Sequence, residues 1–204
     1  MENISDIKIE PLQKSQYVKP YRMHFKQNGV RRIWDLITLH ESVFIVIFNT
    51  ERRKLVCVKQ FRPAVYCNEL AKEDGGLEER NYEDASISGA EGCTLEWCAG
   101  IVDKNIDVKE IAQAEVLEEC GYKVPISKFE KIISCRAGVG VSGEMQTGFY
   151  VEVDDSMKVS EGGGLASEGE MIDVIELSIE DAKKMLERPF VNSPSGHLKM
   201  HLAL

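Results

Sequence analysis

The apolar run Ser-Val-Phe-Ile-Val-Ile-Phe at residues 42–48 constrains the fold more than any other feature of the sequence. Successive side chains of a strand point to opposite faces, and here both sets of side chains are apolar. Such a strand has to be covered on both sides, so we expect a central strand in a layered domain. A second apolar run at 55–61 follows the polar stretch from Asn49 to Lys54 and predicts a neighbouring strand.

The rest of the chain carries both strand and helix patterns. Strand patterns occur near 93–98, 129–136, 146–153 and 171–177, and helical patterns cover 108–120 and about 179–187. Strands that embrace helices in this way predict an α/β sandwich rather than a doubly wound parallel sheet. With 204 residues, the chain is long enough to bury a core of this kind.

The N-terminal part has a pattern of its own. Residues 17–39 alternate basic, aromatic and aliphatic side chains around Asn28-Gly29, which predicts a β-hairpin. We therefore divide the chain into an N-terminal β extension at 1–40 and a main domain at 41–204. Within the main domain, residues 67–91 are polar, with a run of acids around Gly75-Gly76, and are expected to form a long surface insertion.

Composition argues against several classes of partner. The net charge of −9 argues against a nucleic-acid-binding protein, which needs a basic face to displace counterions. No apolar stretch approaches the length of a membrane span, and the start of the chain lacks a signal-peptide pattern. The six cysteines show no CxxC spacing, and several lie in apolar runs, which is typical of reduced thiols. The composition therefore predicts a soluble, cytoplasmic protein.

One helix carries the residues with the clearest chemistry. Asp107 and Glu110 have the spacing of a capping box, so the helix should begin at Val108 and end at Gly121. At about 100° per residue, three carboxylates share an arc with apolar residues one turn earlier. The carboxylates are Glu115, Glu118 and Glu119, and the apolar residues are Val108, Ile111 and Ala112.

These carboxylates continue an apolar stripe instead of occupying the solvated face of the helix. Like charges that face inward repel one another and lose hydration, which is unfavourable without a counter-charge. A divalent cation bound by oxygen atoms supplies that charge. The alternative is a solvated acidic end of the helix, which is the usual fate of an isolated Glu-x-x-Glu-Glu.

The segment around this helix follows the longer pattern Gly100-x5-Ile106-x7-Ala114-Glu115-Val116-x-Glu118-Glu119-x-Gly121-Tyr122. It resembles the Nudix box, G-x5-E-x7-R-E-U-x-E-E-x-G-U, in which U is a bulky aliphatic or aromatic residue. The spacing is kept throughout, but Ile106 replaces the first Glu and Ala114 replaces the Arg. Both are support residues in the family, so the resemblance implies retained metal ligands in a site that is less firmly braced.

The resemblance covers roughly residues 17–187. Within this range, the sequence is most similar to the UDP-glucose pyrophosphatase branch of the ADP-ribose pyrophosphatase group of Nudix hydrolases. The similar segments outside the box are Arg22 to Asp35, 56–66, 96–100, 138–143 and 162–170. The resemblance implies a Nudix α/β/α sandwich with a mixed sheet, plus an N-terminal antiparallel β extension. It also implies a homodimer, because the N-terminal strands of this group often swap between subunits.

The resemblance implies roles for individual residues as well. The expected metal ligands are the backbone carbonyl of Ala99 and the side chains of Glu115, Glu119 and Glu170. Mg²⁺ is the expected cofactor, with Mn²⁺ as the alternative. The expected catalytic residues are Glu118 and Glu168, with Glu168 as the general base. Substrate contacts are expected from Arg62, Arg32, Trp34 and Gly100, although packing is the commoner fate of a lone Trp.

Three functions remain open from the sequence. The first is Mg²⁺-dependent hydrolysis of the diphosphate of a nucleoside diphosphate sugar, with UDP-glucose giving UMP and glucose 1-phosphate. The second is the same reaction on ADP-ribose, giving AMP and ribose 5-phosphate. The third is a nucleotide-sugar-binding Nudix protein of low activity, which Ile106 and Ala114 favour and the retained glutamates oppose.

Overall fold

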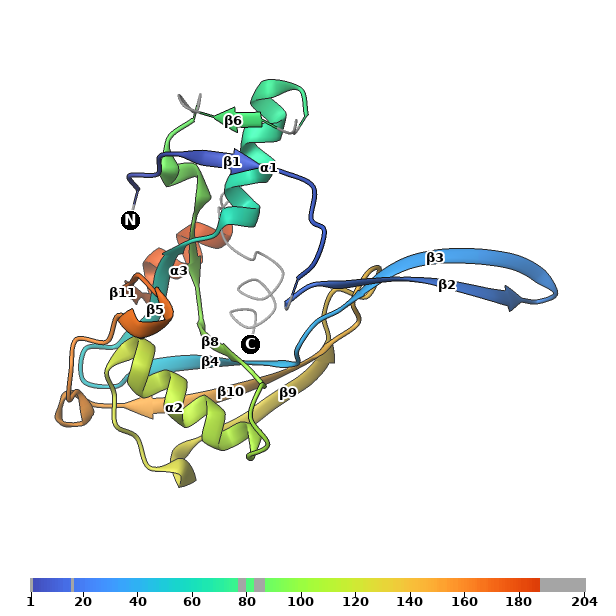
Figure 1. The fold of residues 1–204 in the computed structure, drawn as a ribbon. Coiled ribbons are helices and arrows are strands. Elements are labelled where there is room, and N and C mark those ends of the chain that lie inside the picture. The colour runs from blue at the N-terminus through green and yellow to red at the C-terminus, as the bar shows by residue number, and fades with distance from the viewer. Residues whose placement is uncertain (1, 16, 77–79, 83–86, 188–204) are drawn as a thin grey trace.

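The centre of the protein is a mixed sheet with the strand order β11-β5-β4-β10-β9 (Figure 1). The computed structural model describes residues 2–15, 17–76, 80–82 and 87–187. Strands β4 and β10 run parallel, and the other neighbours along this path run antiparallel. The strands are β4 (Ser42–Asn49), β5 (Lys54–Phe61), β9 (Glu130–Arg136), β10 (Met145–Val153) and β11 (Ile172–Ser178). The central position predicted for the apolar run at 42–48 is confirmed.

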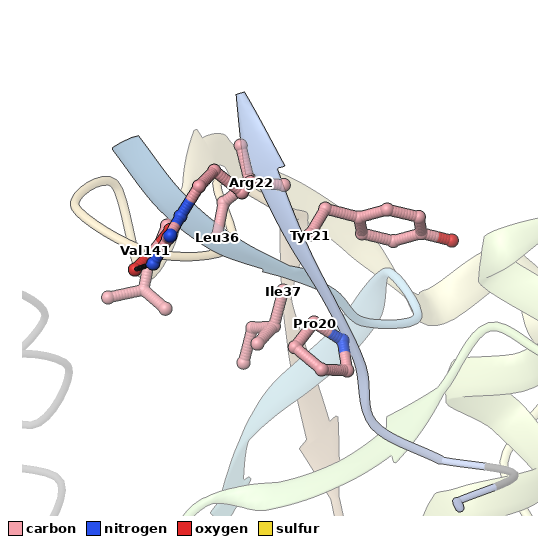
Figure 2. A pocket seen from close by; sticks show the side chains of 7 residues that line it. Pro20, Tyr21, Arg22, Leu36, Ile37 and Val141 are labelled. Atoms are coloured by element: carbon pink, nitrogen blue, oxygen red, sulfur yellow. Dashed lines mark hydrogen bonds and ion pairs between the residues drawn. The ribbon is translucent and has the colours of Figure 1, made fainter. Parts of the chain in front are cut away.

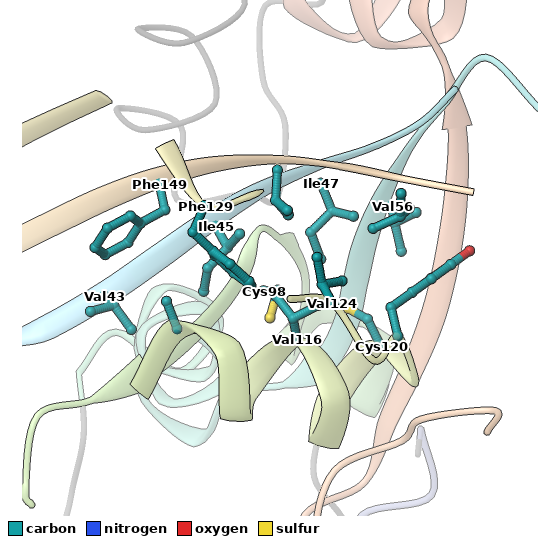
Figure 3. Packing of buried hydrophobic residues seen from close by; sticks show 14 of the residues in the cluster. Val43, Ile45, Ile47, Val56, Cys98, Val116, Cys120, Val124, Phe129 and Phe149 are labelled. Atoms are coloured by element: carbon teal, nitrogen blue, oxygen red, sulfur yellow. The ribbon is translucent and has the colours of Figure 1, made fainter. Parts of the chain in front are cut away.

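Both faces of β4 are covered, as its apolar pattern predicted. On one face, Val43, Ile45 and Ile47 pack against α2 (Val108–Cys120), and Figure 3 shows this layer. On the other face, Phe44 and Val46 share a buried cluster with Ala182 of α3 (Ile179–Glu187). The fold is therefore the expected α/β/α sandwich. Among the described residues, no helix is long and apolar enough to cross a membrane.

Strands β4 and β5 pair only near the turn that joins them, and two short strands continue the sheet beyond that point. β7 (Cys93–Glu96) pairs with the second half of β5, and β8 (Cys98–Ile101) pairs with the first half of β4. The sequence predicted one strand over 93–98, but the chain leaves one neighbour and joins the other at Trp97. This change of partner places β8 beside α2, where the residues of the Nudix-like segment gather.

The predicted hairpin consists of β2 (Lys19–Gln27) and β3 (Val30–Thr38), which pair antiparallel around Asn28 and Gly29. Both turn residues have positive φ, at 52° and 82°, as a tight two-residue turn requires. The hairpin is a separate two-stranded sheet that extends away from the central sheet (Figure 1). Its base is attached by the Ile37 amide, which donates to the Val141 carbonyl at 2.9 Å.

The first part of the segment 67–91, which was predicted to be a polar surface insertion, is helical in the structure. Helix α1 (Pro63–Asp74) runs into it and buries Tyr66 and Leu70, which lie one turn apart. β1 (Ile7–Ile9) pairs with β6 (Arg80–Tyr82), and Ile7 packs against the same cluster. Charged residues between these apolar positions hid the helix from a composition-based prediction. Residues 77–79 and 83–86 of the insertion lie outside the described part of the chain.

The cysteine prediction is confirmed, since all six cysteines are free. Cys57, Cys98 and Cys120 are fully buried. Burial raises the pKa of the Cys57 thiol to about 12, because a thiolate would lose its hydration there. These thiols therefore act as small apolar side chains in the core.

Candidate active site

Local hydrogen bonds fix both ends of α2, the helix that carries the glutamates of the box. The Lys109 amide donates to the Asp107 carboxylate at 2.8 Å, and the Asp107 amide donates to Glu110 at 3.3 Å. At the other end, Gly121 adopts a φ of 74° and its amide donates to the Leu117 carbonyl at 3.0 Å. The predicted capping box and glycine terminator are both confirmed.

A cavity of 460 Å³ lies beside α2 and collects most of the residues that the resemblance singled out. They come from three separate parts of the chain: the end of β5, strand β8 with α2, and the loop before β11. The predicted site residues that line the cavity are Arg62, Ala99, Gly100, Glu115, Glu118, Glu119, Glu168 and Glu170. Two predicted substrate contacts, Arg32 and Trp34, do not line this cavity.

Glu119 is the most deeply buried carboxylate of the site, with 4% of its surface exposed. Its Oε2 accepts a hydrogen bond from the Ala99 amide at 3.0 Å, which joins α2 to β8. Burial raises the pKa of Glu119 to about 7, although the Ala99 hydrogen bond opposes that rise. The Ala99 hydrogen bond therefore holds the Glu119 carboxylate in place, although burial removes the water that would hydrate its charge.

Glu115 lies one turn earlier on the same face of α2. Burial, followed by the charges of Glu119, Glu118 and Glu170, raises the pKa of Glu115 to about 8, while the charge of Lys104 lowers it. The backbone of Gly100 lies against this side chain, because a Cβ at Gly100 would be 2.0 Å from Glu115 Oε1. A glycine is therefore needed at position 100 to leave room for the carboxylate.

The glycine-rich loop at 162–164 docks on the C-terminal end of α2. The amides of Gly163 and Gly164 donate to the carbonyls of Glu119 and Glu118 at 2.9 and 3.1 Å. These carbonyls are free to accept because the last turn of a helix has no intrahelical donors for them. The docked loop brings the short 3₁₀ helix η4 (Ala166–Glu168) and Glu170 to the cavity.

The donor set fits a divalent cation. Carboxylate oxygens are the ligands that hard divalent ions prefer, and the mutual repulsion that raises the Glu115 pKa is what a cation would remove. In the structure, Glu119 accepts from the Ala99 amide and Glu170 accepts from the Leu165 amide at 2.8 Å. Within the described ranges, no three Asp, Glu, His or Cys side chains already converge as metal ligands. Each of the two amide hydrogen bonds uses one carboxylate oxygen, Oε2, and leaves the other oxygen for an ion.

Arg62 is hydrogen-bonded to Glu96, a residue that the sequence did not identify as part of the site. Its Nε and Nη2 donate to the two carboxylate oxygens of Glu96 at 2.8 and 2.6 Å. Glu96 is 8% exposed and lies on β7, where it pairs with Val58 of β5. This bidentate pair fixes the guanidinium plane and leaves Nη1 without a hydrogen bond in the described part of the protein. Only the β5–β7 pairing brings these two residues together.

Arg32 and Trp34 belong to the hairpin, outside the carboxylate cavity. Arg32 donates to Gln27 at 3.4 Å, and Trp34 Nε1 donates to the Gly140 carbonyl at 2.8 Å. A second cavity, of 450 Å³, lies between the hairpin and the loop around Val141 (Figure 2). Arg22 and Asp35 are among the residues that line it, and Arg22 donates two hydrogen bonds to Asp35 at 2.7 and 2.8 Å.

No protein-family model matches this chain. A uridine diphosphate glucose pyrophosphatase from Bos taurus is 39% identical over 203 residues, which cover 96% of this chain and 91% of that protein. With the box pattern on α2, this similarity decides the family. The chain belongs to the Nudix hydrolases.

Two other similar proteins are more distant in sequence. A GDP-mannose pyrophosphatase from Cronobacter sakazakii is 27% identical, covering 78% of this Nudix hydrolase and 72% of that protein. The solved structure of an ADP compounds hydrolase superposes with a TM-score of 0.63 at 17% identity, covering 97% of this chain and 94% of that one. At that identity, the structural match supports the fold alone. Nudix hydrolases generally use a divalent metal ion, in agreement with the donor set of the cavity.

The two departures from the Nudix box lie at the cavity. Ile106 and Ala114 both line it, and Ile106 is 47% exposed. Neither side chain carries a charge, so neither can form an ion pair with the glutamates of the cavity. The bracing of the glutamates therefore comes from the Ala99 amide, the Leu165 amide and the loop at 162–164.

Proposed function

We propose that this Nudix hydrolase cleaves the diphosphate of a nucleoside diphosphate sugar, with UDP-glucose as the first substrate to test. The products would be UMP and glucose 1-phosphate. The observation that carries the proposal is the cavity in which five glutamates of α2 and the late loop meet Arg62. Support for UDP-glucose over other diphosphates comes from the name of the bovine relative, which matches nearly the whole chain.

The proposed metal is Mg²⁺, held by Glu115, Glu119, Glu170 and the backbone carbonyl of Ala99. When bound, Mg²⁺ supplies neutralisation of charge on the diphosphate oxygens. Mn²⁺ offers the same oxygen preference and is the alternative ion. These residues fit a divalent cation because Glu115 and Glu119 are buried and Glu115 is repelled by neighbouring carboxylates. A doubly charged ion would offset both unfavourable effects.

The proposed roles of the other residues follow from their position at the cavity. Glu168 is exposed on η4 and would accept the proton of the attacking water. Glu118 lies next to the metal-binding glutamates and would help to orient that water. Arg62, whose guanidinium is held in place by Glu96, would present its free Nη1 to a phosphate oxygen. Gly100 would contribute by leaving space for Glu115.

Product analysis tests the reaction. We expect the purified protein to convert UDP-glucose to UMP and glucose 1-phosphate only with Mg²⁺, and with a higher kcat/KM than for ADP-ribose. Chromatography of the reaction mixtures, with and without Mg²⁺, distinguishes the two sets of products. Preference for ADP-ribose, with AMP and ribose 5-phosphate as products, would replace the substrate. Saturable binding of both compounds without turnover would indicate a binding protein.

We also propose that the protein is a homodimer joined through its hairpins. Tyr21, Met23 and Trp34 share one face of the hairpin, because Met23 lies opposite Trp34 and alternate residues share a face. Each of these side chains is about half exposed in the single chain, at 52%, 51% and 47%. A second copy would cover this apolar face and would bring Arg32, which lies two residues before Trp34, toward a neighbouring subunit.

Light scattering on the eluting protein tests the assembly. We expect the mass of two chains for the unmodified protein and the mass of one chain for Met23→Glu, because a charge in an apolar interface is strongly unfavourable. Val159→Glu replaces another exposed apolar residue, away from the hairpin, and should remain a dimer. A single-chain mass for the unmodified protein would contradict the proposal.

A further inference from the structure

The carboxylate cavity has an unusual balance of charge for a site that accepts a diphosphate. Among the described residues, seven acidic side chains line it but only two cationic side chains do. The acids are Glu96, Asp103, Glu115, Glu118, Glu119, Glu168 and Glu170, and the cations are Arg62 and Lys104. These acids repel a diphosphate that approaches the cavity. Positive charge at the cavity offsets this repulsion, so each cationic side chain contributes to binding.

The two cations are not equivalent. Arg62 is held by Glu96 through two hydrogen bonds, so much of its charge is compensated within the protein. Lys104 is exposed and lies in the loop between β8 and α2. Within the described ranges, it makes no hydrogen bond and no ion pair. Among the described residues that line the cavity, its ammonium group is therefore the cation with no protein partner, whereas Arg62 has only Nη1 free.

Lys104 lies close enough to the metal-binding glutamates to act on the same substrate. It lines the cavity together with Glu115, and the charge of Lys104 lowers the pKa of that carboxyl. The loop that carries it is fixed at both ends, by β8 and by the capping box of α2. A lysine side chain on such a loop can swing its charge across the cavity mouth, since it has a flexible four-carbon stem.

We propose that Lys104 binds the diphosphate of the substrate and is a specificity-determining contact for anionic substrates. The proposal rests on the proposed function, in which the cavity accepts a nucleoside diphosphate sugar. Lys104 would pair with phosphate oxygens that the metal ion leaves free, and it would contribute to substrate affinity more than to the chemical step. Because no acid of the described residues lies within hydrogen-bonding distance of Lys104, no ion pair among them has to break for Lys104 to bind a ligand.

Kinetics and equilibrium binding test this role together. We expect Lys104→Gln to raise KM for UDP-glucose about tenfold with little change in kcat, as for the loss of one charge-assisted contact. Lys104→Arg should keep most of the affinity, because it keeps the charge. Lys109→Gln is the matched control: it removes the same charge five residues along the chain, where the side chain does not line the cavity. This control should retain the KM of the unmodified protein.

Calorimetric titration with inorganic pyrophosphate in the presence of Mg²⁺ gives a measurement independent of turnover. We expect Lys104→Gln to weaken pyrophosphate binding about tenfold and Lys109→Gln to leave it unchanged. Equal effects of the two variants would overturn the proposal, because they would show only a general effect of net charge. A fall in kcat at constant KM would also overturn it, since Lys104 would then act through Glu115. If the unmodified protein does not hydrolyse UDP-glucose, the proposed function fails, and the pyrophosphate titration still decides the role of Lys104.

Discussion

Glu119→Gln is expected to abolish turnover while leaving the fold intact. Glu119 is the most buried carboxylate of the cavity and is fixed to β8 by the Ala99 amide. The amide of glutamine keeps the shape and can accept the same hydrogen bond, but it lacks the charge that holds a divalent cation. A loss of about 4 kcal/mol of transition-state stabilisation corresponds to a fall in kcat of about a thousandfold. Steady-state kinetics with saturating Mg²⁺ measures this change.

Glu110→Gln provides the matched control for that experiment. It makes the same chemical change on the same helix, but Glu110 is exposed in the first turn of α2. Glutamine is also suited to the capping box, so the helix should begin where it does now. Normal kinetics in both variants would contradict the role of Glu119 as a metal ligand. Loss of activity in both would indicate that the whole helix is sensitive to charge.

Glu119→Gln is expected to lower activity but to raise the stability of the metal-free protein at high pH. The pKa of Glu119 is about 7 in the folded protein against a reference value of 4.5. Below 4.5 the carboxyl is protonated in both states and costs nothing; as pH rises toward and through 7, the folded protein must bear a buried charge and loses stability. Glu119→Gln removes this loss. Its melting temperature without metal should exceed that of the unmodified protein at pH 8 and match it near pH 4.5; equal values at pH 8 would contradict the buried-charge explanation.

Gly100→Ala is expected to reduce activity strongly with little loss of stability. The new Cβ would lie 2.0 Å from Glu115 Oε1, so the carboxylate would have to move. A glutamate side chain moves easily, and the fold should therefore tolerate the methyl group. Displacement of the Glu115 carboxylate by about 1 Å from the position where it would bind the metal can lower kcat about a hundredfold. The two measurements are kcat and the Mg²⁺ concentration that gives half-maximal activity, which should rise.

Gly140→Ala separates this steric effect from a general effect of removing a glycine. No atom outside its immediate chain neighbours lies within 4 Å of a Cβ at Gly140, and its φ is not positive. Both variants lose the same conformational freedom of the unfolded chain, so their melting temperatures should be close to that of the unmodified protein. Equal activity of the two variants would contradict the proposed contact between Gly100 and Glu115.

The sequence by itself determined those parts of the protein that depend on short-range interactions. The central position of β4 followed from apolar residues on both of its faces, and the hairpin followed from Asn28-Gly29. The limits of α2 followed from Asp107 and Gly121, whose hydrogen bonds are made within one turn of the helix. The box spacing then placed the glutamates on the inward face of α2, because helical rotation per residue is fixed. Each of these features is set by residues a few positions apart.

Only the tertiary structure decided how distant residues meet at the cavity. The pairing of β7 with β5 brings Glu96 to Arg62, and the docking of the 162–164 loop on α2 brings in Glu168 and Glu170. The presence of Lys104 and Glu115 at the same cavity likewise depends on the packing of β8 against α2. Sequence periodicity reports which face of an element is buried but not which element covers it. The partner is chosen by strand register and packing across the whole chain, and these set the balance of charge in the site.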